Sequence, residues 1–233
     1  MGFDARMRLF LVLAAVFVTC LLVGDIIGGK LVQTTLGGQT LTLTVGMIPF
    51  PVTFLLTDLL NEFYGKRAAR LVTWIGFAMA TLAYVFIFIA GAVPIAQLTR
   101  DMGWQGVTEE SFNRVFLSSQ RMIVASLTAY LVAQLVDIWV FHLLRTRTAG
   151  RFLWLRATGS TAVSQLVDTV AINLVAWVGL LGPGQIASIV VSSYVVKLVI
   201  AIGLTPLIYA GHGIVERVFG IEPVAAIAAE TAE

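Results

Sequence analysis

Two short segments place an amide and a carboxylate three residues apart inside runs that are otherwise apolar. Both read Gln–Leu–Val–Asp, from Gln134 to Asp137 and from Gln165 to Asp168. Residues three apart lie on one face of a helix. A carboxylate accepts two parallel N–H donors, and a side-chain amide both donates and accepts. This equipment suits a flat, uncharged or weakly cationic heterocycle with an aminopyrimidinone edge.

The apolar segment 45–64 carries a third polar face. Its members follow the spacing i, i+4, i+7 and i+8 of a single helical face and are Phe54, Asp58, Asn61 and Glu62. Such a face in a membrane helix is expected to line a polar cavity. For Glu62 an interfacial pair with Lys66 stays open as an alternative. Pro49 and Pro51 interrupt regular helix near the start of the segment.

The elements that position these faces must lie in a membrane. Of the 233 residues, 58% are hydrophobic and 12% are charged, and the mean hydropathy is +0.93; soluble domains carry about 25% charged residues. Six stretches reach the length of about 20 residues that a membrane span needs. We predict an all-α integral membrane protein, a single domain over 1–233 with a mobile tail at 218–233. Its expected spans are 9–31, 45–64, 70–93, 121–143, 158–180 and 186–210.

The basic residues predict the orientation. Counting by loop places ten Lys and Arg residues on the side of the N-terminus and four on the other side. The positive-inside rule then makes both termini cytoplasmic, in agreement with an even number of spans. We interpret these residues as topology anchors, since no basic run interleaved with aromatics suggests nucleic acid. Arg6 and Arg8 precede a run too long for a signal peptide, so the first span is expected to be retained.

Two loops on the side opposite the termini have patterns of their own. The polar, uncharged segment 33–44 is rich in Thr and Gly and is expected to be extended or hairpin-like. In the connection 94–120, Thr108 is a plausible N-cap followed by two acidic residues. A short apolar face then predicts a helix on the outer interface.

Ionisable groups within spans cost about 2.5–3.5 kcal/mol each on insertion scales, so they normally face a bundle interior. Asp168 and Lys197 both fall near the midplane of adjacent antiparallel spans. They either form an ion pair that locks these spans or line a working cavity; we favour the cavity, because a buried pair adds little stability. Asp25 and Lys30 are expected to end the first span rather than to act as ligands.

Other residues supply less. Aromatic side chains that could stack on a planar ligand are Phe54, Tyr84, Trp139, Trp177 and Tyr194. The single cysteine, Cys20, and the two histidines, His142 and His212 near span ends, indicate neither a disulfide framework nor a metal site, and no cofactor is expected.

Three segments resemble the queuosine precursor transporter family, also called vitamin uptake transporters. They are FPVTFLLTDLLNEFYGKRAAR at 50–70, SQLVDT at 164–169 and YVVKLVIAIGLTPLIY at 194–209. The resemblance implies six helices arranged as in the substrate-binding subunits of energy-coupling-factor transporters, and import of the 7-deazaguanines preQ0 and preQ1. The site candidates that it implies are Asp58, Asn61, Glu62, Gln165, Asp168 and Lys197. Ile172 departs from the family pattern, which has an aromatic residue there.

We therefore expect an inner-membrane importer with a small-molecule substrate, lipid contacts and no enzymatic activity. The alternative is an energy-coupling-factor substrate-binding subunit, although the first span lacks an Ala-x-x-x-Ala ladder. The chain has no Walker A motif, and its aspartates lack the Gly-x-Gly-Asp context of membrane proteases. Small residues around Gly76 and Ala80 could support a homodimer. The predicted substrate-binding residues are Phe54, Asp58, Asn61, Glu62, Gln134, Asp137, Gln165, Asp168, Tyr194 and Lys197.

Overall fold

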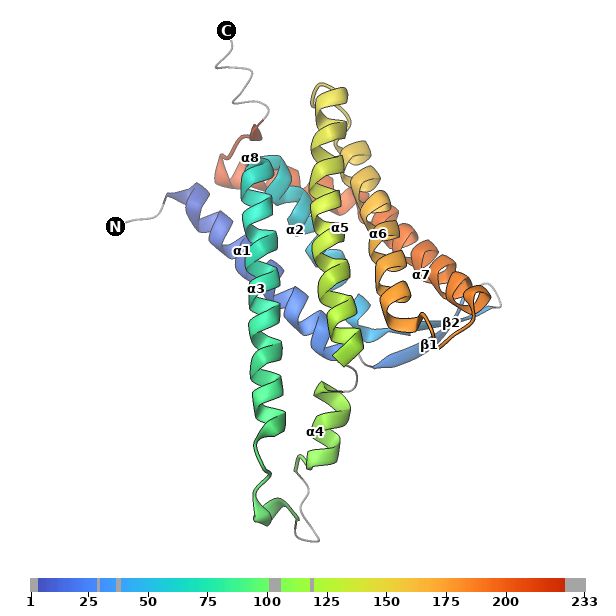
Figure 1. The fold of residues 1–233 in the computed structure, drawn as a ribbon. Coiled ribbons are helices and arrows are strands. Elements are labelled where there is room, and N and C mark those ends of the chain that lie inside the picture. Colours follow the sequence, from blue (N-terminus) through green and yellow to red (C-terminus); the bar gives the residue numbers. More distant parts are fainter. Residues whose placement is uncertain (1–3, 29, 37–38, 101–105, 118–119, 225–233) are drawn as a thin grey trace.

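The computed structural model describes residues 4–28, 30–36, 39–100, 106–117 and 120–224, and this part of the chain is mostly helical (Figure 1). The elements are α1 (Ala5–Ile27), β1 (Leu31–Leu36), β2 (Gln39–Thr44), η1 (Val45–Met47), α2 (Phe50–Phe63), α3 (Gly65–Ala92), η2 (Gln97–Arg100), α4 (Glu109–Phe116), α5 (Gln120–Arg147), α6 (Leu153–Trp177), α7 (Pro183–Gly203) and α8 (Thr205–Phe219). The prediction of a helical membrane protein is confirmed, with one short antiparallel hairpin added to it.

Among the residues that the structure describes, four helices are long and apolar enough to cross a membrane, namely α1, α3, residues Ile123–Arg147 of α5, and α7. The 25-residue α6 is not among them, and besides Asp168 it carries Ser164, Gln165, Thr169 and Asn173 in its apolar stretch. The 14 residues of α2 extend over only about 21 Å at 1.5 Å per residue, less than the hydrocarbon thickness of about 30 Å.

Prolines interrupt regular helix in two of the six stretches expected to be membrane spans. In the stretch 45–64, the turn η1 precedes α2, whose first turn contains Pro51. In the stretch 186–210, α7 ends at Gly203 and α8 begins at Thr205, with Pro206 in its first turn. Proline is tolerated in a first turn but removes a hydrogen bond from a helix interior. The interruption near Pro49 and Pro51 was predicted from the sequence, whereas the one before Pro206 was not.

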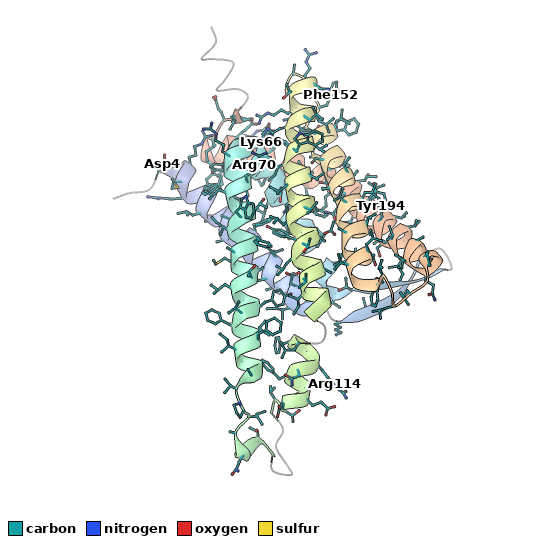
Figure 2. The ribbon with its side chains drawn as sticks, in the orientation of Figure 1. Asp4, Lys66, Arg70, Arg114, Phe152 and Tyr194 are labelled. Atoms are coloured by element: carbon teal, nitrogen blue, oxygen red, sulfur yellow. The ribbon has the colours of Figure 1, made fainter. Side chains whose placement is uncertain are left out.

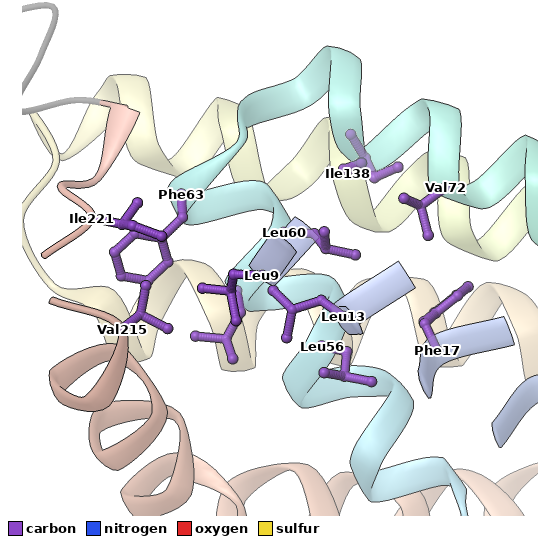
Figure 3. Packing of buried hydrophobic residues seen from close by; sticks show 12 residues of the cluster. Leu9, Leu13, Phe17, Leu56, Leu60, Phe63, Val72, Ile138, Val215 and Ile221 are labelled. Carbon is purple, nitrogen blue, oxygen red and sulfur yellow. The ribbon is translucent and has the colours of Figure 1, made fainter. Parts of the chain in front are cut away.

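A hydrophobic core occupies the end of the molecule where α2 meets α3 (Figure 3). Phe17 of α1, Leu60 and Phe63 of α2, and Val72 of α3 are at most 2% exposed there. Ile221 packs into the same cluster and is 5% exposed, and α8 continues to Phe219. Within the predicted tail 218–233, Ile221 is thus packed, Val218 and Phe219 are exposed, and residues 225–233 lie outside the described part.

The two ends of the molecule carry different elements. Lys66 and Arg70 lie at the end that also holds the α5–α6 loop with Phe152, whereas Arg114 on α4 lies at the opposite end (Figure 2). The hairpin is also away from α8 (Figure 1). We call the end with α8 and the α5–α6 loop the basic end and the other the hairpin end.

The loops at the hairpin end follow the sequence patterns. Strands β1 and β2 pair antiparallel, with Leu31 opposite Thr44, which confirms the expected hairpin. Thr108 caps α4 by accepting a hydrogen bond from the backbone N–H of Ser111. The location of α4 at a membrane interface stays a prediction.

The small residues of α3 serve packing within the chain. A Cβ added to Gly76 would lie 2.7 Å from the hydroxyl oxygen of Tyr130 on α5 and 3.1 Å from Leu21 on α1. Ala80 is completely buried. These two residues let α3 approach α1 and α5 closely, so they no longer support the predicted homodimer.

Candidate functional site

A cavity of about 730 Å³ lies between the helices toward the hairpin end. Residues of η1 and of the helices α1 to α7 line it, with Tyr84 and Ile87 from α3 and Val115 and Phe116 from α4. Small-molecule sites in proteins typically have volumes of about 300–1,000 Å³. The cavity is thus large enough for a small planar molecule.

Helix α6 contributes a polar stripe to the cavity wall. Gln165, Asp168, Thr169 and Asn173 all line it, at the spacing of one helical face. Asn173 donates a hydrogen bond of 2.7 Å to the carbonyl oxygen of Thr169. Gln165 Oε1 and Thr169 Oγ1 are buried and have no hydrogen-bond partner among the described residues. Buried polar groups are normally hydrogen-bonded, so this wall offers unused polar atoms to a ligand.

Asp168 and Lys197 form an ion pair on the same wall, with 2.6 Å between Oδ2 and Nζ. Their side chains are 12% and 11% exposed. Lys197 Nζ also lies 4.8 Å from the ring centroid of Phe50, within cation–π distance. The geometry therefore agrees with both interpretations of these residues: they form an ion pair between α6 and α7, and they line the cavity.

The opposite wall carries a carboxylate that sequence reasoning set aside. Asp25 of α1 lines the cavity and accepts a hydrogen bond of 3.0 Å from Ser126 Oγ of α5. It had been expected to end the first span rather than to act as a ligand. It does lie in the last turn of α1, which ends at Ile27, but it also lines the cavity. The position of Asp25 inside an apolar run could have indicated that it lines the cavity, as the same feature did for Asp168.

Amide and aromatic side chains complete the cavity. Gln134 lines it and donates through Nε2 to Thr57 Oγ1 at 3.4 Å. The rings of Phe50 and Phe54 meet edge to face, 4.8 Å between centroids. The aromatic residues on the wall are Phe17, Phe50, Phe54, Tyr84, Phe116, Tyr130 and Trp177. Trp139, one of the aromatics considered for stacking, is 54% exposed instead.

Ile172, where the family resemblance leads us to expect an aromatic residue, is also part of the wall. Tyr194 is not, and its hydroxyl donates to the carbonyl oxygen of Ala162. An aromatic face for a ligand is therefore supplied by α2 and its neighbours rather than by residue 172.

Two further predicted residues are buried between the cavity and the basic end. Asp58 is 2% exposed, and neither of its carboxylate oxygens has a hydrogen-bond partner among the described residues. Asp137 is 5% exposed and accepts a hydrogen bond of 3.0 Å from Ser164 Oγ. Neither residue lines the cavity.

Glu62 binds Arg156 of α6 rather than Lys66, which corrects the alternative considered for it. Arg156 donates from Nε to Oε2 at 3.1 Å and from Nη2 to Oε1 at 2.6 Å. His212 Nε2 lies 3.7 Å from Oε1. The pair joins α2 to α6, and because both side chains are buried, water does not screen the attraction between the charges.

Asn61 belongs to the same cluster at the basic end. His142 Nε2 lies 3.2 Å from Asn61 Oδ1, and Arg145 Nη1 donates to its backbone oxygen at 3.4 Å. Arg145 and Arg156 are 9% and 4% exposed. Two of the basic residues interpreted as topology anchors therefore have partners inside the protein.

The ten predicted site residues thus divide into two sets. Those on the cavity wall are Phe54, Gln134, Gln165, Asp168 and Lys197. Those packed away from it are Asp58, Asn61, Glu62, Asp137 and Tyr194. In the described part of the chain, no group of three His, Cys, Asp or Glu side chains could hold a metal ion.

Comparison with known proteins gives a consistent result. Residues 44–211 match the family described as "Putative vitamin uptake transporter". The "Probable queuosine precursor transporter" of Bacillus subtilis is 33% identical over 172 residues, which cover 73% of this chain and 72% of that protein.

Two other relatives are matched over shorter segments. The "Queuosine precursor transporter" of Escherichia coli is 31% identical over 134 residues, 58% of this chain and 55% of that protein. The "Probable queuosine precursor transporter" of Haemophilus influenzae is 32% identical over 127 residues, 54% of this chain and 48% of that protein. This chain thus spans about half the length of both. No solved structure matches the chain significantly.

The three motifs that suggested the family all lie within the matched segment 44–211, and this match confirms the family predicted from them. The family is one of transporters, which is not a class of enzymes. Together with the four long apolar helices, it makes the chain a multi-pass protein of the inner membrane. The chain belongs to the vitamin uptake transporter family.

Proposed function

We propose that this chain imports queuosine precursors, the 7-deazaguanines preQ0 and preQ1, and binds the planar base in the cavity. The observation that carries the proposal is the wall of α6, where unpartnered polar atoms of Gln165 and Thr169 lie beside the carboxylate of Asp168. The names of three relatives, all queuosine precursor transporters, support the substrate class.

The base would use its hydrogen-bonding edge on this wall. A guanine-like edge presents N1–H and an exocyclic amine, two parallel donors that match the acceptors of one carboxylate. In the proposed complex Asp168 accepts both, and Lys197 turns toward the ring carbonyl. Gln165 Oε1 accepts a further donor, and Phe50 or Phe54 packs on the ring face.

We further propose six membrane passes with both termini cytoplasmic and the cavity open to the outer side. The placement of Lys66 and Arg70 at the end that holds the α5–α6 loop supports this orientation (Figure 2), because cytoplasmic loops carry an excess of Lys and Arg. The second pass would consist of η1 and α2 together.

A thermal-shift panel of purines, 7-deazaguanines and vitamins on the purified protein tests the substrate. Stabilisation grows as RT ln(1 + [L]/Kd), so a ligand at a hundred times its Kd adds about 2.7 kcal/mol. We expect the 7-deazaguanines to raise the melting temperature selectively. A response to riboflavin or biotin, with none to 7-deazaguanines, would overturn the substrate assignment.

Uptake into liposomes that contain only this chain tests the mechanism. A standalone importer is expected to carry the base without any ATPase. Uptake that requires added coupling and ATPase subunits would instead establish the energy-coupling-factor alternative.

A further inference from the structure

Asp58 lies between the cavity and the cluster at the basic end, without a partner that could neutralise it. It follows Phe54 of the cavity wall by four residues on α2 and precedes Glu62 by four, so all three share one helical face. Its side chain is 2% exposed, and both oxygens lack a hydrogen-bond donor among the described residues. An ionised carboxylate is costly to bury in this state.

The charged groups around Asp58 do not remove this cost. Those that interact with it are Asp137 from α5, Glu62 from its own helix and Arg156 from α6. Arg156 is already bound to both carboxylate oxygens of Glu62 and to the carbonyl oxygens of Gly150 and Arg151. Asp58 therefore interacts with two other acids and with one guanidinium that uses four of its five N–H donors on other partners.

The remaining nearby charges have other partners. From α5, His142 contacts Asn61, and Arg145 donates from Nη1 to the backbone oxygen of Asn61 while its buried Nη2 has no hydrogen-bond partner among the described residues. From α8, His212 faces Glu62 and Glu216. Lys197 of α7 binds Asp168, and Asp25 of α1 accepts from Ser126 in the cavity.

Two neighbouring carboxylates that share a site hold one proton between them, because both cannot ionise at low cost. We propose that Asp58 and Asp137 form a proton-binding site, and that a proton passing through it drives import. The second half of this statement rests on the proposed function, whereas proton binding does not. A hard cation takes six or more oxygen ligands in proteins. A proton needs only one carboxylate, which fits the unpartnered Asp58.

The position of the site gives the proton a mechanical effect. When Asp58 is protonated, Arg156 stays bound to Glu62. This ion pair keeps α2 joined to α6 on the side of the cavity that faces the basic end. Loss of the proton toward the cytoplasm creates a negative charge one helical turn from that ion pair and attracts Arg156. The contact between α2 and α6 then loosens, and the bound substrate gains a route inward.

Infrared difference spectroscopy of the purified protein tests proton binding without any substrate. The carbonyl stretch of a protonated carboxylic acid is expected near neutral pH. It should disappear in Asp58→Asn and shift in Asp137→Asn, which changes the neighbour of the protonated acid. Glu110→Gln is the matched control, since Glu110 is exposed and paired with Arg114, and this variant should keep the band. One folded variant of the two suffices for the assignment.

Two results would overturn the proton site. The first is a band that is absent from the wild type or unchanged in the folded variants. The second is stabilisation of the wild type by sodium ions, lost in Asp58→Asn, which would mark a metal-cation site instead.

Uptake of a 7-deazaguanine into liposomes tests the coupling. An inward proton gradient is expected to accelerate uptake by the wild type several-fold, while Asp58→Asn binds the base but no longer responds to the gradient. Wild-type uptake that ignores the gradient contradicts the coupling. If the wild type binds no 7-deazaguanine, the proposed substrate is wrong, and the infrared result still decides whether the site holds a proton.

Discussion

Two buried ion pairs of this chain each join an acidic and a basic side chain from apolar segments, but they differ in their hydrogen bonds and in their surroundings. Arg156 and Glu62 make two hydrogen bonds, and their side chains are 4% and 3% exposed. Lys197 and Asp168 make one contact of 2.6 Å at the wall of a cavity, with 11% and 12% exposed. The first pair is enclosed by protein, and the second can exchange its partner for a ligand.

The difference comes from the number of donors and from the surroundings. A guanidinium has five N–H donors in a fixed fork, so Arg156 binds Glu62 and two loop carbonyls at the same time. An ammonium is a compact charge on a flexible stem, and Lys197 can reorient within the cavity. Residue chemistry therefore suits one pair to joining helices and the other to binding.

The largest effect is expected when the enclosed pair is broken. In Arg156→Ala, Glu62 remains buried without its partner, which typically costs about 3–5 kcal/mol. Chemical denaturation of the purified protein measures the loss. Arg114→Ala is the control, because the exposed pair Arg114–Glu110 contributes about 1 kcal/mol or less. Equal losses in the two variants would remove the distinction between an enclosed and an exposed pair.

The pair on the cavity wall should affect binding more than stability. Asp168→Asn keeps the shape but removes the charge that accepts two donors of the base. Truncating one member of a hydrogen-bonded charge pair costs about 2–5 kcal/mol, so affinity for a 7-deazaguanine should fall at least about 30-fold in calorimetry. Unchanged affinity in a folded variant would take Asp168 out of the binding site.

A smaller effect is expected from the unpartnered amide. Gln165→Met removes an oxygen that has no partner in the free protein, so stability should stay equal or rise. Ligand affinity should drop by about 1–3 kcal/mol if Oε1 accepts a hydrogen bond from the base. Thermal melts with and without ligand measure both quantities. A loss of stability without a loss of affinity would make Gln165 structural.

The smallest effect is expected on the stability of a variant that lacks the whole cavity pair. In Asp168→Leu with Lys197→Leu, both charges disappear together, and such replacements are often neutral. We expect a change on the order of 1 kcal/mol or less, together with loss of ligand binding. A folded double variant that still transports would show that the pair only joins α6 to α7.

Much of the cavity wall could be predicted from the sequence, because a polar residue in a membrane span normally faces the protein interior. Phe54, Gln134, Gln165, Asp168 and Lys197 were identified from type and spacing, and all line the cavity. Asp25 was missed because its place in the last turn of α1 gave it a structural explanation, although the same side chain lines the cavity. Asn173 was missed because the polar face of α6 was followed for only one turn.

The sequence by itself determined the class of protein, the family and which helix faces turn inward, since burying a polar group in lipid is costly at any position. It could not determine which residues of those faces line the cavity and which ones pair with other side chains. Asp58 and Asp168 both sit in apolar runs, yet only Asp168 reaches the cavity. Likewise Glu62 pairs with Arg156, 94 residues away, rather than with Lys66 one turn on. Only the tertiary structure decides such partners, because they depend on how distant helices pack and on which space they leave empty.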